Sequence, residues 1–476
     1  MVVGTASHVG KSWTATAICR FLRRRGVRVA PFKAQNMSLN SYPCVDGGEI
    51  GRSQAAQAEA CGLEPRSDMN PVLLKPSGPD GSQVILNGKV WKQLSATAYY
   101  EHYEELLGEV RAAYQRLADE FDFLVIEGAG AAAELNLRSR DLVNLPLAAD
   151  LGVPALLVAD IDRGGVFASV VGTMQLLEGD EKELVRGFVI NRFRGERSLF
   201  SEGRQTLERL AERPCLGVFP YAPDIHLDAE DSVSLDAPPS EPRSSSELRV
   251  AVVRLPHIAN FTDFRLLPNV EYVTEAAQYD PDLIIIPGTK NTLEDLAWLQ
   301  RIGLDRWILD RRKDGAAVWG VCGGYQMLGR FISDPREVES KRGRLPGLGL
   351  LPHKTTITSE KTTREVSARL AVDGRDFTAY EIHMGDTEPP AGDSPFAFID
   401  GKAEGCLRRG ILGTYLHGAL EDPAVAQFLL EDVANWKNKP APKIRGVADK
   451  QKHYDRLADW FEGHVDWPRF EELYLR

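Results

Sequence analysis

Short apolar runs bounded by turn residues alternate with helix-length segments over the first 235 residues of the chain. Runs such as 123–126 (Phe-Leu-Val-Ile) contain no polar residue, as is typical of strands buried on both faces. Strands that alternate with helices form parallel sheets, because each helix returns the chain across a face of the sheet. The pattern predicts an α/β fold with a doubly wound, mostly parallel sheet. Its six expected strands are residues 1–3, 27–32, 123–127, 155–160, 187–191 and 216–220.

A second α/β domain is expected after a break in composition. Residues 236–247 are rich in proline, serine and charge, which predicts an exposed linker. Shorter alternating runs between residues 350 and 416 predict an added antiparallel region. Buried-type strands are expected at 248–254, 283–287 and 316–321. The expected units are a first domain at 1–235, the linker, a second domain at 248–440 and a charged helical tail at 441–476.

The composition excludes several classes of protein. Of the 476 residues, 43% are hydrophobic and 26% are charged, which argues against wholesale disorder, collagen-like structure and coiled coil. The net charge of −11 argues against nucleic acid or an anionic membrane as a partner, because both require a basic surface. No apolar run approaches the length of a membrane span. These features indicate a soluble enzyme-like chain.

The cysteines and the first residues bear on the compartment. The six cysteines are scattered without a Cys-x-x-Cys pair, so we expect neither a disulfide framework nor a zinc cluster. The chain opens with Met1-Val2-Val3 and a glycine motif, which leaves no room for a signal peptide. We therefore expect a reducing, cytoplasmic location.

A glycine-rich loop follows the first expected strand. Residues 4–12 read Gly-Thr-Ala-Ser-His-Val-Gly-Lys-Ser and precede a helical stretch, the context in which backbone N–H groups cradle phosphates. Five residues separate the two glycines, so this is a longer variant of the common phosphate loop. We expect Lys11 to contact the β and γ phosphates of a nucleotide and Ser12 to bind Mg²⁺. The expected nucleotide-binding residues of the loop are Gly4, Thr5, Gly10, Lys11 and Ser12.

Polar residues end several other strands at the same edge of the predicted sheet. Glu127 and Asp160 follow strands there and are candidate Mg²⁺ ligands, although acids at strand ends are often helix caps. Lys33 ends the second strand and is a candidate for neutralising a transferring phosphoryl group, with a solvated surface lysine as the alternative. Asn191 is a candidate adenine contact or a turn asparagine.

The second domain contains a candidate nucleophile. Residues 316–326 (Ala-Ala-Val-Trp-Gly-Val-Cys-Gly-Gly-Tyr-Gln) predict a buried strand, a strained turn carrying Cys322, and a helix. A helix N-terminus lowers a thiol pKa and stabilises an oxyanion. His417 ends another alternating run and is the expected base. Backbone N–H groups at Gly288 and Gly323 are expected to form the oxyanion hole.

Two further polar patterns remain open. Residues 380–385 (Tyr-Glu-Ile-His-Met-Gly) alternate, which places Glu381 and His383 on one strand face, and a solvent-facing strand explains this equally well. Residues 52–59 carry polar residues at helical spacing, which we interpret as a polar helix face.

A family resemblance rests on ten segments, namely residues 4–12, 31–40, 69–76, 127–130, 158–167, 255–264, 287–296, 320–329, 380–385 and 415–418. On these segments the chain resembles the cobyric acid synthases, glutamine-hydrolysing amidases of cobalamin biosynthesis, along nearly its whole length. Residues 33–37 (Lys-Ala-Gln-Asn-Met) and 255–264 (Leu-Pro-His-Ile-Ala-Asn-Phe-Thr-Asp-Phe) are similar to this family more than to its relatives. Dethiobiotin synthetase is similar only in the first domain, and cobyrinic acid a,c-diamide synthase shares the two-domain plan.

The resemblance implies a phosphate-loop domain joined to a class I glutaminase-like domain. It implies amidation of the b, d, e and g carboxylates of adenosylcobyrinic acid a,c-diamide with ATP, Mg²⁺ and glutamine. The first domain would phosphorylate each carboxylate, with Lys11 and Lys33 stabilising charge. The second would release ammonia from glutamine through Cys322 and His417. The alternatives are a related ATP-dependent amidase and a phosphate-loop regulatory protein whose glutaminase-like domain only binds.

Two positions depart from the patterns of these families. The family's loop commonly has aspartate where this chain has His8, so no metal or phosphate role is carried over to that position. Triad glutaminases usually have His-x-Glu, but Gly418 and Ala419 follow the histidine here. The orienting carboxylate is therefore either absent, which leaves a Cys-His dyad, or comes from elsewhere in the chain, and we expect glutamine hydrolysis to be slow until the acceptor binds. Glu421 and Glu381 are the nearest candidates for an orienting carboxylate.

Overall fold

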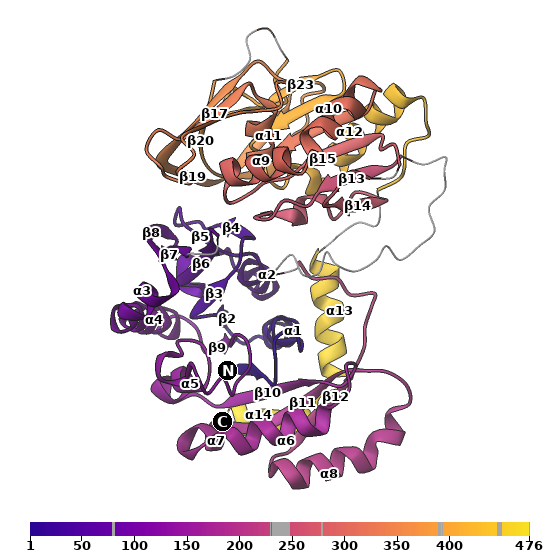
Figure 1. Ribbon diagram of the computed structural model, residues 1–476. Helices are drawn as coiled ribbons and strands as arrows, with labels where there is room; N and C mark the ends of the chain where they lie inside the picture. The colour runs from indigo at the N-terminus through magenta and orange to yellow at the C-terminus, as the bar shows by residue number, and fades with distance from the viewer. Residues whose placement is uncertain are drawn as a thin grey trace.

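The computed structural model describes residues 1–78, 81–228, 230, 248–277, 279–388, 392, 394–444 and 450–475. The expected linker at 236–247 lies outside the described residues. Figure 1 shows two bodies of α/β structure, one built mainly from the first part of the chain and one from the segment between residues 248 and 440.

The first body contains the parallel sheet that the sequence predicts. Strands pair in the order β2-β9, joined through a bridge between Val2 and Glu127 to β1-β10-β11-β12, and all pairings are parallel. The six strands are β1 (Val2–Gly4), β2 (Val29–Phe32), β9 (Phe123–Ile126), β10 (Ala155–Asp160), β11 (Val185–Phe193) and β12 (Cys215–Pro220). All six expected strands are therefore confirmed, with small differences at their ends.

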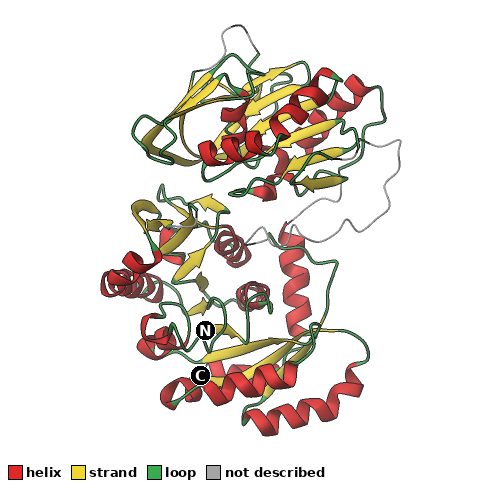
Figure 2. Ribbon diagram, in the orientation of Figure 1, coloured by secondary structure: helices red, strands yellow, loops and turns green. Residues whose placement is uncertain are grey.

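Helices connect these strands and cover the sheet. They are α1 (Lys11–Arg24), α2 (Arg52–Cys61), α3 (Ala96–Glu101), α4 (Tyr103–Ala118), α5 (Leu145–Leu151), α6 (Val166–Leu176), α7 (Gly179–Leu184) and α8 (Ser201–Ala211), with short 3₁₀ turns η1 (Ser67–Met69), η2 (Arg138–Arg140) and η3 (Arg197–Phe200). Figure 2 shows helices on both sides of the yellow strands. Because helices cover both faces, the sheet is doubly wound, as the sequence predicts.

The crossover from β2 to β9 contains strands that the sequence did not predict. A four-stranded sheet has the order β3-β6-β7-β8, and β4 pairs with β5 in a separate hairpin. The strands are β3 (Gln35–Met37), β4 (Ser41–Pro43), β5 (Glu49–Gly51), β6 (Val72–Pro76), β7 (Ser82–Leu86) and β8 (Lys89–Leu94). Several have only three residues, too few to establish a periodic signal. This insert faces the second body in Figure 1.

The second body contains a mainly parallel sheet with the order β14-β13-β15-β16-β24-β23, in which only the β23 pairing is antiparallel. Its strands are β13 (Val250–Val253), β14 (Val270–Val273), β15 (Leu283–Ile286), β16 (Ala317–Val321), β23 (Cys406–Arg408) and β24 (Ile411–Thr414). Its helices are α9 (Thr292–Arg301), α10 (Leu304–Lys313), α11 (Gly323–Leu328) and α12 (Pro423–Lys437), with turns η5 (Phe261–Phe264) and η6 (Ala419–Glu421).

The expected antiparallel region is confirmed beside this sheet. The long strands β19 (Lys354–Leu370) and β20 (Asp376–Thr387) pair antiparallel, and β21 and β22 continue the pattern. The smaller strands of this sheet are β17 (Phe331–Ser333), β18 (Arg344–Pro346), β21 (Ala397–Ile399) and β22 (Lys402–Glu404). One end of β20 lies against the segment that carries His417, through an antiparallel bridge between Tyr380 and His417.

The end of the chain returns to the first body. Helices α13 (Lys450–Glu462) and α14 (Trp467–Tyr474) pack against α1 and the β12 edge, as the yellow segments of Figure 1 show. The rings of Trp13 and Trp460 lie 6.0 Å apart, and those of Phe21 and Phe461 lie 5.3 Å apart. Both ends of the chain therefore build the core that supports the phosphate loop.

All six cysteines are free and buried. Within the part of the chain that the structure describes, none of the helices combines the length and apolar character needed to cross a membrane.

Candidate functional site

The glycine loop joins β1 to α1 and folds as a phosphate loop. Gly10 precedes the helix with φ 103°, and a Cβ there would stand 2.1 Å from the side-chain nitrogen of Asn191, so only glycine fits. The Lys11 side chain is buried and donates hydrogen bonds to the carbonyl oxygens of Ala6 (3.1 Å) and Gly130 (2.6 Å). Burial lowers the pKa of Lys11 to about 8. His8 lies in the same loop with φ 60°.

Asn191 supports this loop. Its side-chain amide donates to the carbonyl oxygen of Val9 (2.9 Å), and its side-chain oxygen accepts from the backbone N–H of Arg192 (2.8 Å). Asn191 thus helps to hold the phosphate loop in place, and its contact with adenine stays a prediction.

Glu127 is the centre of a buried polar cluster beside the loop. Its carboxylate accepts hydrogen bonds from the Ser12 hydroxyl (2.8 Å) and from Lys33 (2.9 Å). Gln57 of α2 donates to the same carboxylate at 2.5 Å and was missed at the sequence level. Lys33 also pairs with Glu230 at 2.6 Å. Burial alone would lower the pKa of Lys33, but the two carboxylates outweigh it and raise that pKa.

Lys33 is 2% exposed, so it is a buried cation of the site and not a solvated surface lysine. Asp160 is at the expected sheet edge, but its carboxylate accepts from Arg192 (2.8 Å) and from the backbone N–H of Asp162 (2.8 Å). The structure brings Ser12, Glu127 and Lys33 together and leaves Asp160 bound to Arg192. The roles of Glu127 and Asp160 as Mg²⁺ ligands stay predictions.

The polar residues of α2 are buried, which corrects our interpretation of residues 52–59 as a polar face. The helix lies between the two bodies (Figure 1), and Arg52, Ser53, Gln54 and Gln57 are all buried. Ser53 donates to Glu230 (3.3 Å) and Gln57 to Glu127, which joins this helix to the phosphate-loop cluster. Burial of polar groups requires such partners.

A cleft of about 520 Å³ opens beside the loop, a volume typical of small-molecule sites. Its lining comes from the loop, from β3, from α2 and from the segment after β12, and includes His8, Lys11, Ser12, Lys33, Asn36, Met37, Ser53, Arg192, Asp228 and Glu230. The lining holds the cations Lys11, Lys33 and Arg192 beside the carboxylates of Asp228 and Glu230, so positive charge is available there to a phosphate ligand.

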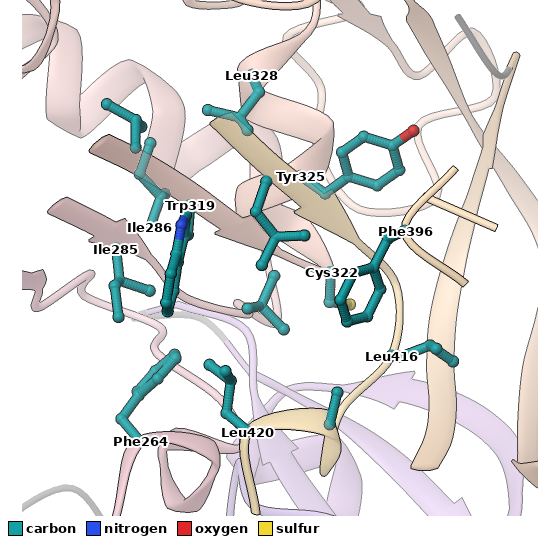
Figure 3. Packing of buried hydrophobic residues seen from close by; sticks show 14 of the residues in the cluster. Phe264, Ile285, Ile286, Trp319, Cys322, Tyr325, Leu328, Phe396, Leu416 and Leu420 are labelled. Atoms are coloured by element: carbon teal, nitrogen blue, oxygen red, sulfur yellow. The ribbon is translucent and has the colours of Figure 1, made fainter. Parts of the chain in front are cut away.

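Cys322 is placed by a strained turn between β16 and α11. It has φ 51° and ψ −108°, an unusual conformation for a residue other than glycine, and it begins the helix. A Cβ on Gly324 would stand 1.9 Å from the carbonyl oxygen of Ile286, so the helix approaches β15 as closely as only glycine allows. Figure 3 shows Cys322 where the strands meet the helix, near Tyr325 and Phe396. The expected nucleophile elbow is present.

Asp263 supplies the carboxylate that the sequence left open. The Nδ1 atom of His417 lies 2.7 Å from one oxygen of Asp263, whose other oxygen accepts from the backbone N–H of Gly418 at 2.8 Å. Both side chains are buried. The dyad interpretation is therefore wrong, because the partner comes from η5, 154 residues earlier in the sequence. The available signal in the sequence was an acid between two phenylalanines, Phe261 and Phe264.

The electrostatics of this group favour a charged histidine. Burial alone would lower the pKa of His417, but the Asp263 carboxylate and Cys322 outweigh it and raise it to about 10. Tyr380 stacks on the imidazole with ring centroids 5.3 Å apart and holds the His417 backbone through two hydrogen bonds of 2.9 Å. Cys322, His417 and Asp263 thus form a buried triad suited to nucleophilic attack.

The other two acids have different partners. Glu421 binds Arg52 (2.9 Å) and Arg265 (3.1 Å) instead of the imidazole. Glu381 binds Arg364 at 2.6 Å and lies 3.6 Å from His383. His383 in turn stacks on Tyr415 and lines the cavity above Cys322, so the face that carries it is not simply solvent-facing.

Gly288 and Gly323 both lie close to the triad. A Cβ on Gly288 would stand 2.8 Å from the Cε1 atom of His417, and a Cβ on Gly323 would meet Thr289 at 2.7 Å. The loop with Gly288 and the turn with Gly323 therefore approach each other beside Cys322. The backbone N–H groups of both glycines stay candidates for the oxyanion hole.

The cavity above Cys322 is bordered by both bodies. From the second body it is lined by Lys290, Gln326 and Glu339 among others, and from the first by Leu39 and Lys75. The segment 33–39 also reaches the other site, since Lys33 and Met37 line the cleft beside the phosphate loop. One short segment therefore borders both cavities.

A phosphate-loop cleft and a Cys-His-Asp triad in one chain define a class, the ATP-dependent amide ligases that take nitrogen from glutamine. Residues 1–235 match the CobQ/CobB/MinD/ParA nucleotide binding domain, and residues 249–425 match the CobB/CobQ-like glutamine amidotransferase domain.

Full-length relatives are more specific. The chain is 43% identical over 501 residues to a cobyric acid synthase of Dehalococcoides mccartyi strain CBDB1, covering 100% of this chain and 97% of the relative. It is 46% identical to a cobyric acid synthase of Bacteroides fragilis strain YCH46 (99% and 97% covered) and 48% identical to a probable cobyric acid synthase of Methanoregula boonei (98% and 97% covered). The chain belongs to the cobyric acid synthase family.

Proposed function

We propose that this protein amidates the b, d, e and g side-chain carboxylates of adenosylcobyrinic acid a,c-diamide, with ATP to activate each carboxylate and glutamine as the nitrogen source. The observation that carries the proposal is the presence, in one chain of this family, of a buried phosphate-loop cluster and a complete nucleophilic triad. Neither site alone would form an amide from a carboxylate and glutamine.

Activation takes place at the first site. A carboxylate oxygen is a poor leaving group, so it first attacks the γ-phosphorus of ATP, and ADP departs to leave an acyl phosphate. Ammonia then adds to the acyl carbon, the bond between that carbon and the phosphate oxygen breaks, and inorganic phosphate and a proton are released. Lys11 and Lys33 carry positive charge at the cleft and stabilise the phosphoryl oxygens during transfer.

The residues beside Lys11 fit a magnesium ion. Ser12 and Glu127 present a hydroxyl and a carboxylate that are 2.8 Å apart, and oxygen donors of this kind suit Mg²⁺. Bound there, Mg²⁺ would neutralise charge on the nucleotide phosphates. The carboxylate of Asp160 is committed to Arg192 and is a weaker candidate.

Ammonia comes from the triad. The Cys322 thiolate adds to the carboxamide carbon of glutamine, and the N–H groups of Gly288 and Gly323 stabilise the oxyanion. The His417 imidazolium donates its proton to the nitrogen, the C–N bond breaks, and ammonia departs while a thioester to Cys322 remains. Neutral His417 then accepts a proton from the water that cleaves the thioester. Glutamate is released, and the thiolate and the imidazolium are restored.

Mass spectrometry of the corrinoid product tests the proposal. The protein is incubated with ATP, Mg²⁺, glutamine and adenosylcobyrinic acid a,c-diamide, with cobyrinic acid as a second acceptor and with reactions lacking ATP or glutamine as controls. Successive conversions of carboxyl to carboxamide on the a,c-diamide alone support the proposal. Conversion of cobyrinic acid at its a and c positions would instead identify an a,c-diamide synthase.

A further inference from the structure

Arg52 is a buried charged residue between the two bodies. It begins α2, and its side chain is 2% exposed. Its Nε atom donates to Asp228 of the first body at 2.8 Å, and its Nη2 atom donates to both oxygens of Glu421 of the second, at 3.1 and 2.9 Å. One planar guanidinium therefore joins two carboxylates from different bodies, a task for which arginine is better suited than lysine.

The first carboxylate belongs to the nucleotide cleft. Asp228 lines that cleft together with Glu230, which pairs with Lys33 at 2.6 Å. The segment that carries Asp228 is therefore fixed at one point by the buried lysine of the phosphate-loop cluster. Asp228 is thus at once a wall residue of the cleft and a partner of Arg52.

The second carboxylate belongs to the segment that carries the catalytic histidine. Glu421 is four residues after His417 and lies on η6, the turn that starts from Gly418. The same turn is held at its start by Asp263 through the Gly418 N–H. Arg265 follows η5 and also binds Glu421, at 3.1 Å. The Glu421 carboxylate therefore ties the two turns that place Asp263 and His417.

A second path joins Arg52 to the same imidazole. Its guanidinium carbon lies 4.7 Å from the ring centroid of Tyr42, which packs on Tyr380 with centroids 4.9 Å apart. Tyr380 stacks on His417 at 5.3 Å. Arg52 thus contacts both elements, η6 and the Tyr380 ring, that fix the orientation of His417.

Positive and negative charges are equal in number in the cluster around Arg52. The cations are Arg52, Arg265 and Lys450, and the anions are Asp228, Glu421 and Glu59, with Lys450 lying 3.3 to 3.7 Å from each of the three. Removal of one buried charge would leave the opposite charges of its partners uncompensated.

We propose that Arg52 is a positioning residue that makes glutamine hydrolysis at Cys322 depend on occupancy of the nucleotide cleft. The proposal rests on the function proposed above and adds its regulation. Ligand binding at the wall that carries Asp228 sets the Arg52 pairing, and that pairing sets the position of η6 and of the His417 ring. Coupling between the sites then limits the loss of ammonia when no acceptor is activated.

Arg52→Gln tests this role, because glutamine cannot bridge the two carboxylates. In the wild type we expect ATP, Mg²⁺ and corrinoid acceptor together to raise glutamate release by about tenfold or more. In Arg52→Gln this rise should disappear, while amidation driven by free ammonium stays within about twofold of the wild type. Arg52→Lys should recover only part of the rise, since an ammonium group binds as a point charge.

Arg369→Gln is the matched control. Arg369 pairs with Asp376 at 2.9 Å within the second body, and both side chains are more than half exposed. It should respond like the wild type. Glu421→Gln provides a second test from the other side of the bridge and should lose the rise as Arg52→Gln does.

Two results would overturn the proposal: a wild-type glutaminase that ignores ATP and acceptor, or an Arg52→Gln enzyme with the full rise. A parallel loss of ammonium-driven amidation in Arg52→Gln would also overturn it, since that result means a general structural role. Failure of the wild type to amidate the corrinoid with either nitrogen source counts against the proposed function instead. In that case ATP-dependent glutamate release still reports on Arg52.

Discussion

The residue with the largest consequence for the chemistry is Asp263. It holds the Nδ1 atom of His417 at 2.7 Å, which fixes the tautomer and orientation of the imidazole and stabilises its charged form. Because this carboxylate is present, slow hydrolysis can no longer be attributed to a missing triad member. Any dependence of hydrolysis on the acceptor must come from elsewhere in the molecule.

Replacing Asp263 with asparagine should therefore impair ammonia release. We expect Asp263→Asn to lower glutamine-dependent amidation by roughly 10³–10⁴-fold, by analogy with loss of the orienting acid in other triads. Ammonium-driven amidation should persist, since the first site is untouched. Steady-state assays with each nitrogen source provide the measurement. Glu381→Gln is the control, and a larger fall in that variant would restore Glu381 as the orienting acid.

The same pair predicts a pH dependence of stability. The pKa of His417 is raised from 6.5 to about 10, so its contribution is fully present below pH 6.5, declines as pH rises and is lost above about 10. Asp263→Asn removes a main cause of the raised pKa, so the stability of the variant should decline less over this window. Urea unfolding midpoints at several pH values test this. Equal slopes in the two proteins would contradict the assigned pairing.

At the scale of elements, the elbow between β16 and α11 depends on close approach to β15. The carbonyl oxygen of Ile286 would lie 1.9 Å from a Cβ on Gly324, and Gly320 is packed against the same turn. The backbone of this region cannot open without moving a central strand of the sheet. The position of Cys322 is therefore a property of the packed core that Figure 3 shows, and not of the loop alone.

A pair of glycine substitutions tests this dependence. Gly324→Ala should destabilise the protein by about 2 kcal/mol or more, because the added methyl group meets backbone and not a flexible side chain. Gly172→Ala in α6 is the control: nothing lies within 4 Å of its Cβ position, so alanine should be neutral or stabilise by up to about 1 kcal/mol. Denaturant unfolding compares them. Equal stabilities would refute the close approach.

At the scale of the whole molecule, two chemistries occupy two bodies that share a boundary. The segment 33–39 lines both cavities, and Arg52 binds carboxylates of both bodies. The first body in turn depends on the end of the chain, since α13 packs on the helix that follows the phosphate loop. The arrangement predicts that the two reactions can be separated by single substitutions.

Complementary variants test this division. Cys322→Ala should abolish glutamine-dependent amidation and keep ammonium-driven amidation, because only ammonia release requires the thiolate. Lys11→Ala should lose amidation with both nitrogen sources, because activation depends on the phosphoryl contacts. Product formation with glutamine or ammonium chloride measures both. Loss of both activities in Cys322→Ala, or near wild-type amidation in Lys11→Ala, would contradict the assignment of the sites.

The sequence by itself determined the features that depend on neighbouring residues. The buried strands of both parallel sheets, the loop at 4–12 and the turn that carries Cys322 were predicted from apolar runs and from glycine spacing. Each follows from local backbone geometry, because glycine permits conformations and approaches that other residues do not. The sequence also predicted that Ser12, Lys33 and Glu127 lie at one edge of the sheet, because the carboxyl ends of parallel strands meet at the same edge.

Only the tertiary structure decided which distant residues meet. Asp263 reaches His417 across 154 residues, and Arg52 reaches Glu421 across 369, distances over which local propensity carries no information. The insert with β3 to β8 and the return of α13 were missed or left unplaced for the same reason, because short strands and amphipathic helices do not specify a partner. Such contacts are selected when buried charges and apolar faces must be satisfied together, which happens only in the packed molecule.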